Sequence, residues 1–333
     1  MRLKHSFALL LIVSLTLSVS VPIFYGGLES FRVLGRLPLW GIALLLGMVL
    51  LGWRLNAARL QLLGGSLGLR LSGRQALSTV VATEFASAAT PAGSGGPPTL
   101  VFLLTEKGLS TGRSAGMLAV DALADLVFFG TAIPIAILLF LSRSGVSHPL
   151  LFGGLLLTLI LAGLALLWLV VHKHRSILLW LGNLARRIRF LARFRFRMAR
   201  MVVHFRQAVA LLIRMPLHRL LALYLFTAGH WLLRYSVLAV LLWLLKESVP
   251  WAYLFLVQSI LLFGGQILLL PGGGGGVEIG FGALLSTYLN PATSALTLIV
   301  WRFCTFYWYL LVGAPVFILQ TGRAARRLLA PAG

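Results

Sequence analysis

Long apolar runs separated by short polar stretches dominate this chain. A helix needs about 20 apolar residues to cross the roughly 30 Å hydrocarbon core of a bilayer. We predict that six runs are membrane-spanning helices: 6–25, 38–56, 114–141, 149–171, 217–245 and 293–319. The pattern therefore predicts an all-α polytopic membrane protein.

Two further apolar runs are interrupted in the middle by proline and glycine. The first, 76–105, is broken from Thr90 to Pro98, and the second, 250–288, is broken at Pro271 and the five glycines that follow it. Proline removes a helix donor and glycine weakens a helix, so neither run is expected to be one continuous helix. Each is predicted to form a helical hairpin, which either is re-entrant or crosses the bilayer twice.

The positive charges orient these runs, because Lys and Arg are concentrated in cytoplasmic loops. The connection 172–216 is therefore expected to be cytoplasmic. Alternation of the spans then places both termini in the cytoplasm, and puts Arg54, Arg59, Arg70 and Arg74 on the same side. Between 172 and 219 there is no acidic residue, and the cations are Lys173, Arg175, Arg186, Arg187, Arg189, Arg193, Arg195, Arg197, Arg200, Arg206, Arg214 and Arg219.

Apolar residues alternate with arginines over 177–214 within this basic connection. The pattern fits an amphipathic helix at the membrane surface, with its arginines on lipid phosphates. It fits equally well a loop whose charges only enforce the topology.

With this orientation the two halves of the chain, 1–171 and 217–333, form a possible inverted repeat. In each half a Pro/Gly-broken run precedes a span that carries charge, namely Asp121 and Asp125 in the first and Arg302 in the second. Transporters build midplane sites from discontinuous helices arranged in this way. The alternative is a chance similarity of two Pro/Gly breaks. In either case we expect residues 1–333 to form a single integral membrane domain.

Composition narrows the range of functions. Apolar residues make up 59% of the chain, and 29 Lys and Arg against 7 Asp and Glu give a net charge of +22. Because the cations lie between apolar runs, the expected partners are membrane lipids with anionic headgroups and not nucleic acid. The only cysteine, Cys304, excludes an internal disulfide and a cysteine-based metal centre. We expect no metal or other cofactor, and we predict that the protein is not an enzyme.

Ionisable residues inside apolar runs are the candidate site residues, because each costs about 2.5–3.5 kcal/mol at the centre of a membrane helix. Asp121 and Asp125 lie one helical turn apart, so one is expected to hold a proton unless a cation pairs with them. The set can form a polar cavity that holds an anionic headgroup, or ion pairs that only join helices. Its members are Glu84, Asp121, Asp125, Arg234, Glu278 and Arg302.

The two breaks supply a second group of candidates. Glu84 and Glu278 flank them, where each carboxylate can satisfy free backbone amides or bind a cationic group. The glycine run lacks the Lys-Ser/Thr of a nucleotide-binding P-loop, but its amides and a helix starting near Val277 can form an anion site. The alternative is a tight turn that allows close packing. The break residues singled out are Pro91, Gly93, Gly95, Gly96, Pro97, Pro271, Gly272, Gly275 and Gly276.

Three motifs together resemble the transmembrane, flippase-like domain of lysylphosphatidylglycerol synthase and its stand-alone relatives. The first break, from Thr90, is similar to the family's TP-x-x-x-GG-x-P segment, and is followed by the acidic helix. The second, Pro271 to Glu278, resembles PG-x-x-GG-x-E, and Trp301-Arg302 with Tyr307 resembles W-R-x-x-x-x-Y. The resemblance implies movement or handling of a lipid across the cytoplasmic membrane. The chain is too short to contain the soluble aminoacyl-transfer domain as well.

These observations favour a lipid flippase or transporter of the cytoplasmic (inner) membrane, which moves an anionic or aminoacylated lipid. Arg302 is expected to hold the phosphate while Asp121 and Asp125 tune the charge of the cavity, with Glu84, Glu278, Arg234 and Tyr307 as further binding residues. One alternative is a proton-coupled transporter of a small solute. Another is an accessory protein that docks a lipid-modifying enzyme through 177–214. A homo-oligomer is compatible with each.

Overall fold

The computed structural model describes residues 37–143, 215–267 and 270–329, with isolated positions at 12, 16, 20, 24, 35, 154 and 158. Four helical stretches are long and apolar enough to cross a membrane, and they coincide with four of the six predicted spans. They are α3 (Leu39–Ser66), α6 (Thr111–Arg143), α11 (Leu217–Leu244), and the continuous stretch of α14 (Pro291–Arg302), π-helix η1 (Phe303–Tyr307) and α15 (Trp308–Leu329). The predicted spans 6–25 and 149–171 and the basic connection 172–216 lie almost entirely outside the described residues.

Each Pro/Gly-broken run forms two short helices joined by a loop, as predicted from the breaks. The helices are α4 (Gly73–Ala89) and α5 (Gly96–Glu106) in the first run, and α12 (Trp251–Ile267) and α13 (Gly276–Leu285) in the second. The longest of them has 17 residues, which corresponds to about 26 Å of helix. None therefore matches the length of a typical membrane span.

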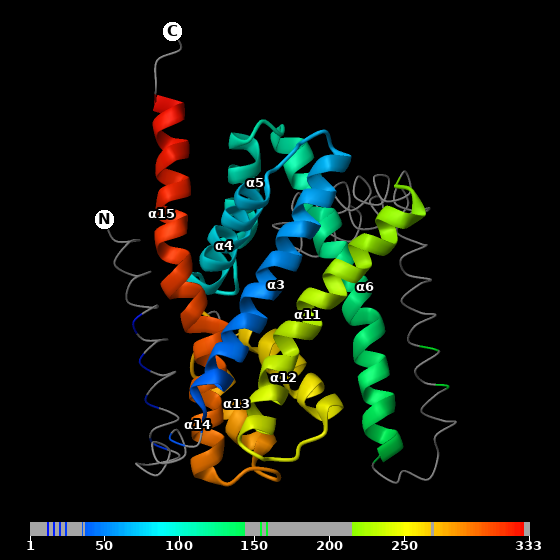
Figure 1. Cartoon of the computed structure of the whole chain (residues 1–333), viewed down its shortest axis with the longest axis vertical. Coiled ribbons are helices and arrows are strands. Elements are labelled where there is room, and N and C mark those ends of the chain that lie inside the picture. Colours follow the sequence, from blue (N-terminus) through cyan, green and yellow to red (C-terminus); the bar gives the residue numbers. More distant parts are fainter. Residues whose placement is uncertain are drawn as a thin grey trace, which may run out of the picture.

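The two halves repeat the same succession of elements. Helices α3 and α11 each have 28 residues, α4 and α12 each have 17, and α5 and α13 have 11 and 10. A long helical stretch follows in both halves. Figure 1 shows α4 and α5 toward one end of the molecule and α12 and α13 toward the other, with α3 and α11 running between these ends. The two hairpins thus extend toward the centre from opposite ends.

The tips of the two hairpins meet in the interior. Pro91 and Pro271 form an isolated antiparallel bridge. The amide of Gly93 donates to the carbonyl of Thr90 at 3.2 Å in the first tip. In the second tip the amide of Gly273 donates to the carbonyl of Leu270 at 2.9 Å. In both tips the two residues after the proline have positive φ: Ala92, Gly93, Gly272 and Gly273. The two loops therefore share a backbone conformation although their sequences differ.

The core lies between α3 and α11, which pack along each other. Leu45 of α3 and Leu238 of α11 are fully buried there. A tryptophan of each helix also packs edge-on against an aromatic ring of the other half: Trp53 of α3 contacts α15, and Trp231 of α11 contacts α6. The ring centroids are 5.0 Å apart for Trp53 and Tyr309, and 4.8 Å apart for Trp231 and Phe129. These contacts interlock the two halves.

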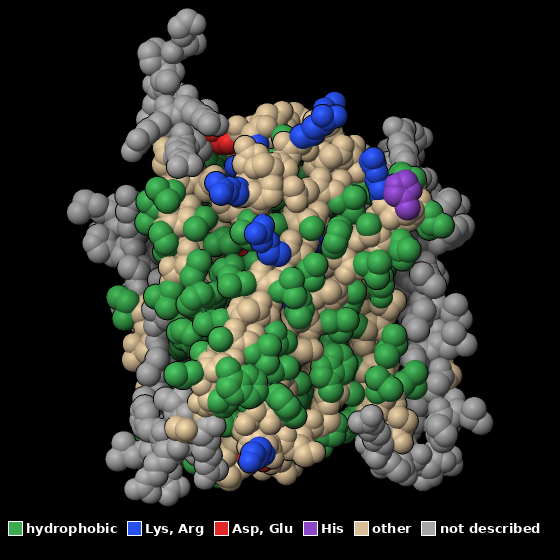
Figure 2. Space-filling model, viewed as in Figure 1, with side chains coloured by type: hydrophobic (Ala, Val, Ile, Leu, Met, Phe, Trp, Pro, Cys, Tyr) green, Lys and Arg blue, Asp and Glu red, His purple; other side chains and the backbone are tan. Residues whose placement is uncertain are grey.

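The surface is apolar around the middle of the molecule. In Figure 2 hydrophobic side chains cover the central band, and most of the visible Lys and Arg side chains gather toward one end. Figure 1 shows that the C-terminal end of α15 points toward this same end. An apolar belt with charged ends is what a bilayer requires of a protein that spans it.

The tip of the second hairpin provides a stability test. Gly273 has φ +68°, and a Cβ there would lie 2.8 Å from the backbone of Gly265. We expect Gly273→Val to destabilise the protein by about 2 kcal/mol or more, because strain and overlap add. Gly282→Ala is the control, since nothing lies within 4 Å of an added Cβ. Thermal unfolding in detergent should show a loss for Gly273→Val only. Equal melting temperatures would contradict the described loop.

Candidate functional site

Arg59 holds the two aspartates of α6 in the first of three buried ion-pair groups. Its guanidinium nitrogens lie 2.5 Å from Asp121 and 2.6 Å from Asp125, and the residue is 2% exposed. Trp231 also donates to Asp125 at 2.8 Å. A single cation thus pairs with both carboxylates, and its desolvation is offset by short contacts.

The position of Arg59 corrects the sequence analysis, which placed it among the cytoplasmic cations. Helix α3 continues to Ser66, ten residues beyond the predicted end of the 38–56 span, so Arg59 lies within the helix and faces α6. Arg234 and Arg302, the two cations among the candidate site residues, do not pair with the aspartates of α6. In the structure they pair with Glu84 and Glu278.

The second group is a sealed ion pair between Arg302 and Glu278. Two guanidinium nitrogens lie 2.5 and 2.6 Å from the same carboxylate oxygen of Glu278. The two side chains are 2% and 0% exposed. Phe306 lies beneath the guanidinium, with its ring centroid 4.9 Å away. Glu278 also lies in the first turn of α13, where the helix dipole favours a negative charge.

The third group, Arg234 and Glu84, has a longer contact than the other two groups and is more open than the sealed pair. The closest nitrogen and oxygen atoms are 3.4 Å apart, and the side chains are 20% and 19% exposed. Asn56 also donates to Glu84 at 3.4 Å. The Arg234 guanidinium lies 5.6 Å from the ring centroid of Trp231 and 4.9 Å from that of Tyr309. Its Nε–H has no acceptor among the described residues. The aromatic rings therefore hold this cation in place while its buried Nε–H makes no hydrogen bond to the described residues.

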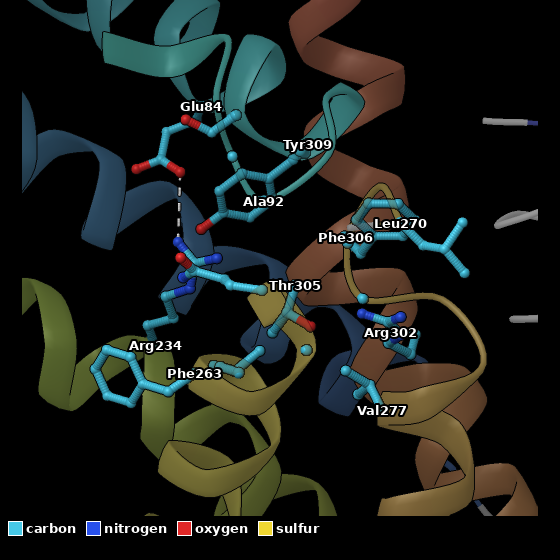
Figure 3. Close-up of a pocket in the computed structure, with 18 of the residues that line it drawn as sticks. Glu84, Ala92, Arg234, Phe263, Leu270, Val277, Arg302, Thr305, Phe306 and Tyr309 are labelled. Carbon is cyan, nitrogen blue, oxygen red and sulfur yellow. Dashed lines mark hydrogen bonds and ion pairs between the residues drawn. The ribbon is translucent and has the colours of Figure 1, made fainter. Parts of the chain in front are cut away.

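Arg234 and Glu84 face a cavity of about 170 Å³ between the two hairpin tips, which we call the central cavity. Figure 3 shows both side chains directed toward it, with Tyr309 on one side and Arg302 and Val277 deeper on the other. Its lining includes residues from both tips and from both halves of the chain: Ala92, Gly93, Leu270, Gly272, Gly273, Trp231, Phe263, Thr305 and Phe306.

A second cavity of about 250 Å³ lies beside Arg59, and we call it the acidic cavity. It is lined by three carboxylates, those of Glu84, Asp121 and Asp125, and by one guanidinium. Glu84 and Trp231 line both cavities, as does Ser87. The Glu84 side chain is therefore part of the boundary between the central cavity and the acidic cavity.

The structure distributes the predicted site residues unevenly. Glu84, Arg234, Arg302, Gly93 and Gly272 line the central cavity, and Asp121, Asp125, Gly96 and Pro97 line the acidic cavity. The remaining predicted residues are absent from both linings, and their roles stay predictions: Glu278, Tyr307, Pro91, Gly95, Pro271, Gly275 and Gly276.

Sequence reasoning missed Arg59, Trp231 and Tyr309 as site residues. For Arg59 a signal existed, because the apolar residues that follow it, such as Leu60 and Leu63, indicate that the helix continues. For the two aromatic residues there was none. An aromatic side chain in an apolar run does not reveal which cation it contacts.

Backbone amides of the first tip make hydrogen bonds within the loop itself. Gly95 donates to the Thr90 hydroxyl at 2.7 Å, and Gly96 donates to the carbonyl of Gly93 at 3.1 Å. The next two residues are prolines and have no N–H. These groups are therefore not available to an anion. At the second tip the carboxylate of Glu278 already lies in the first turn of α13.

The sealed pair gives a prediction that separates a structural role from a binding role. Arg302→Gln removes the cation that pairs with the buried Glu278 carboxylate, so we expect a loss of about 3–5 kcal/mol in stability. Adding Glu278→Gln removes that charge and should recover most of the loss. Thermal unfolding of the two variants in detergent checks this. If Arg302→Gln on its own were as stable as the parent protein, the pair would not stabilise the fold.

Comparisons with known proteins agree with the membrane architecture. The chain is 26% identical over 269 residues to a protein of Archaeoglobus fulgidus described as a UPF0104 membrane protein, covering 79% of this chain and 81% of that one. The model of the family described as the lysylphosphatidylglycerol synthase TM region matches residues 9–313. The apolar helices and this match together indicate a multi-pass membrane protein whose family is named for a lipid synthase. The chain belongs to the lysylphosphatidylglycerol synthase TM region family.

Proposed function

We propose that the protein moves a phospholipid across the cytoplasmic membrane and that Arg234 binds the phosphate of the lipid headgroup in the central cavity. The observation that carries this proposal is the state of Arg234. It is held between two aromatic rings, its ion pair with Glu84 is long, and its Nε–H has no acceptor among the described residues. A planar guanidinium with a free donor is well suited to phosphate.

Arg302, the first choice from the sequence, is less suited to the cargo. Its charge is neutralised by Glu278 at 2.5 Å, and the two side chains are almost fully buried. Binding a phosphate there would leave the Glu278 carboxylate without its cation in the interior, which is costly. We therefore assign Arg302 a supporting role, in which it fixes α13 against α14 beside the cavity.

The family and the dimensions of the cavity support a lipid as the cargo. The family is named after a lipid-synthesising enzyme, and it covers nearly the whole chain. The central cavity, at about 170 Å³, has room for several water molecules and therefore for a small polar group such as a phosphate. In this proposal the acyl chains stay in the bilayer. The proposal involves transport only and assigns no bond-breaking step to the protein.

We propose further that the two hairpins are re-entrant and belong to an inverted-topology repeat. Their short helices, their matching loops and their entry from opposite ends of the molecule favour this arrangement. The bridge between Pro91 and Pro271 then lies near the middle of the bilayer, where such transporters bind their cargo. The cation-rich end is assigned to the cytoplasm, in the inner membrane, together with both termini.

Neutralising Arg234 tests the proposed function. In proteoliposomes, Arg234→Gln should reduce the movement of fluorescent phosphatidylglycerol between leaflets at least tenfold, because the headgroup loses its counter-charge. Quenching of the outer-leaflet label with dithionite measures this movement. Arg54→Gln is the matched control, since Arg54 is an exposed cation on α3 that lines neither cavity. Unchanged lipid movement in a folded Arg234→Gln variant would refute the role of Arg234.

A further inference from the structure

The ion-pair groups of the described helices hold more acids than cations. Three arginines and four acids make up the ion-pair groups in the described helices, and one of these arginines serves two aspartates. Isolated negative charge is unstable in a membrane interior, where an acid either pairs with a cation or takes up a proton. An anion that enters and takes the cation of one of these acids must therefore leave that acid either with another cation or with a proton.

Glu84 is the acid that an entering anion would displace. The Nε–H groups of Arg234 and Arg59 both have no acceptor among the described residues. Arg234 differs from Arg59 in its contact with the acid, because the Glu84–Arg234 distance of 3.4 Å is the longest among the described ion pairs. A phosphate on Arg234 would leave Glu84 with Asn56 as its one neutral partner, again at 3.4 Å. The other four acid–arginine contacts are 2.5 or 2.6 Å long, so an entering anion would have to break a shorter contact there.

The surroundings of Glu84 would not supply another cation. In the acidic cavity it shares the lining with Asp121 and Asp125 of α6, Arg59 of α3 and His230 of α11. Arg59 is already held by both aspartates, and the Nδ1 of His230 lies 3.0 Å from the Gly52 carbonyl oxygen. In the central cavity, Arg302 of α14 is paired with Glu278 of α13, and Tyr309 of α15 is neutral.

We propose that Glu84 is a proton-binding site that is coupled to the anion site on Arg234. When a phosphodiester of charge −1 pairs with Arg234, the Glu84 carboxylate takes up one proton through the acidic cavity. When the anion leaves, Glu84 releases the proton and pairs with Arg234 again. The total charge of the arginine, glutamate and anion is zero in both states, so one proton accompanies each anion into the site.

This inference rests on the proposed function, because it takes the headgroup phosphate as the anion on Arg234. The binding chemistry is that of a phosphate, whether it belongs to a lipid headgroup or is free in solution. An experiment that measures protons and anion binding together, without relying on transport, can therefore test the coupling separately.

The experiment is calorimetric titration of the purified full-length protein in detergent. Dihexanoylphosphatidylglycerol is the probe in one arm and inorganic phosphate is the probe in the other. Each titration is repeated in two buffers that differ in their enthalpy of ionisation, and the difference in heat gives the number of protons taken up. The variants are Glu84→Gln, which mimics the protonated acid, and Glu247→Gln as the matched control. Glu247 follows α11 and lines neither cavity.

We expect the parent protein and Glu247→Gln to take up about one proton per lipid bound. Their affinity should fall about tenfold for each pH unit once Glu84 is ionised in the free protein, because binding and protonation are linked. Glu84→Gln should still bind the lipid, take up no proton and lose the pH dependence.

The other outcomes separate the two proposals. Lipid binding by the parent protein without proton uptake, or equal uptake in Glu84→Gln, would overturn the role of Glu84 and leave lipid binding in place. Binding of inorganic phosphate alone, with proton uptake that is lost in Glu84→Gln, would keep the proton site and overturn the lipid as cargo. Proton uptake that persists in Glu84→Gln belongs to the phosphate itself and would overturn the role of Glu84. Binding of neither probe by the parent protein would overturn both the proposed function and this inference.

Discussion

The interior of this protein is organised by the requirement that a charge inside a bilayer must have a partner. Three arginines meet this requirement by joining helices, and two of them join helices that are distant in the sequence. Arg59 ties α3 to α6, Arg234 ties α11 to α4, and Arg302 ties α14 to α13. Apolar packing alone distinguishes poorly between helix neighbours in lipid, because lipid tails are as apolar as leucine. The ion pairs therefore help to determine which helices lie together.

The three groups differ in how completely they are closed. The Arg59 and Arg302 groups have contacts of 2.5 and 2.6 Å around almost fully buried guanidinium groups, and breaking either would strand a buried charge. The pair of Glu84 and Arg234 is longer and borders open volume on two sides. We therefore assign the first two groups to the stability of the fold. The longer contact of the third group is our reason for assigning the proposed function to it.

The sequence was sufficient to predict the four long helical stretches and the two interruptions that the described residues show. Run length indicated the spans, and proline with glycine indicated the breaks, because both depend on local properties of the chain. The pairing of charges could not be predicted in this way. Asp121 and Asp125 were recognised as one face of a helix, but their partner Arg59 was assigned to a loop. Which cation meets which acid depends on the packing of helices far apart in the sequence, and no local pattern records it.

The most direct test is an experimental structure of the protein with a bound phospholipid in a lipid nanodisc. The account predicts a headgroup phosphate in the central cavity within hydrogen-bonding distance of Arg234, with the Glu84 carboxylate displaced from the guanidinium. The pairs of Arg302 and Arg59 should be unchanged. A headgroup bound elsewhere in the protein while Arg234 and Glu84 stay paired would contradict it.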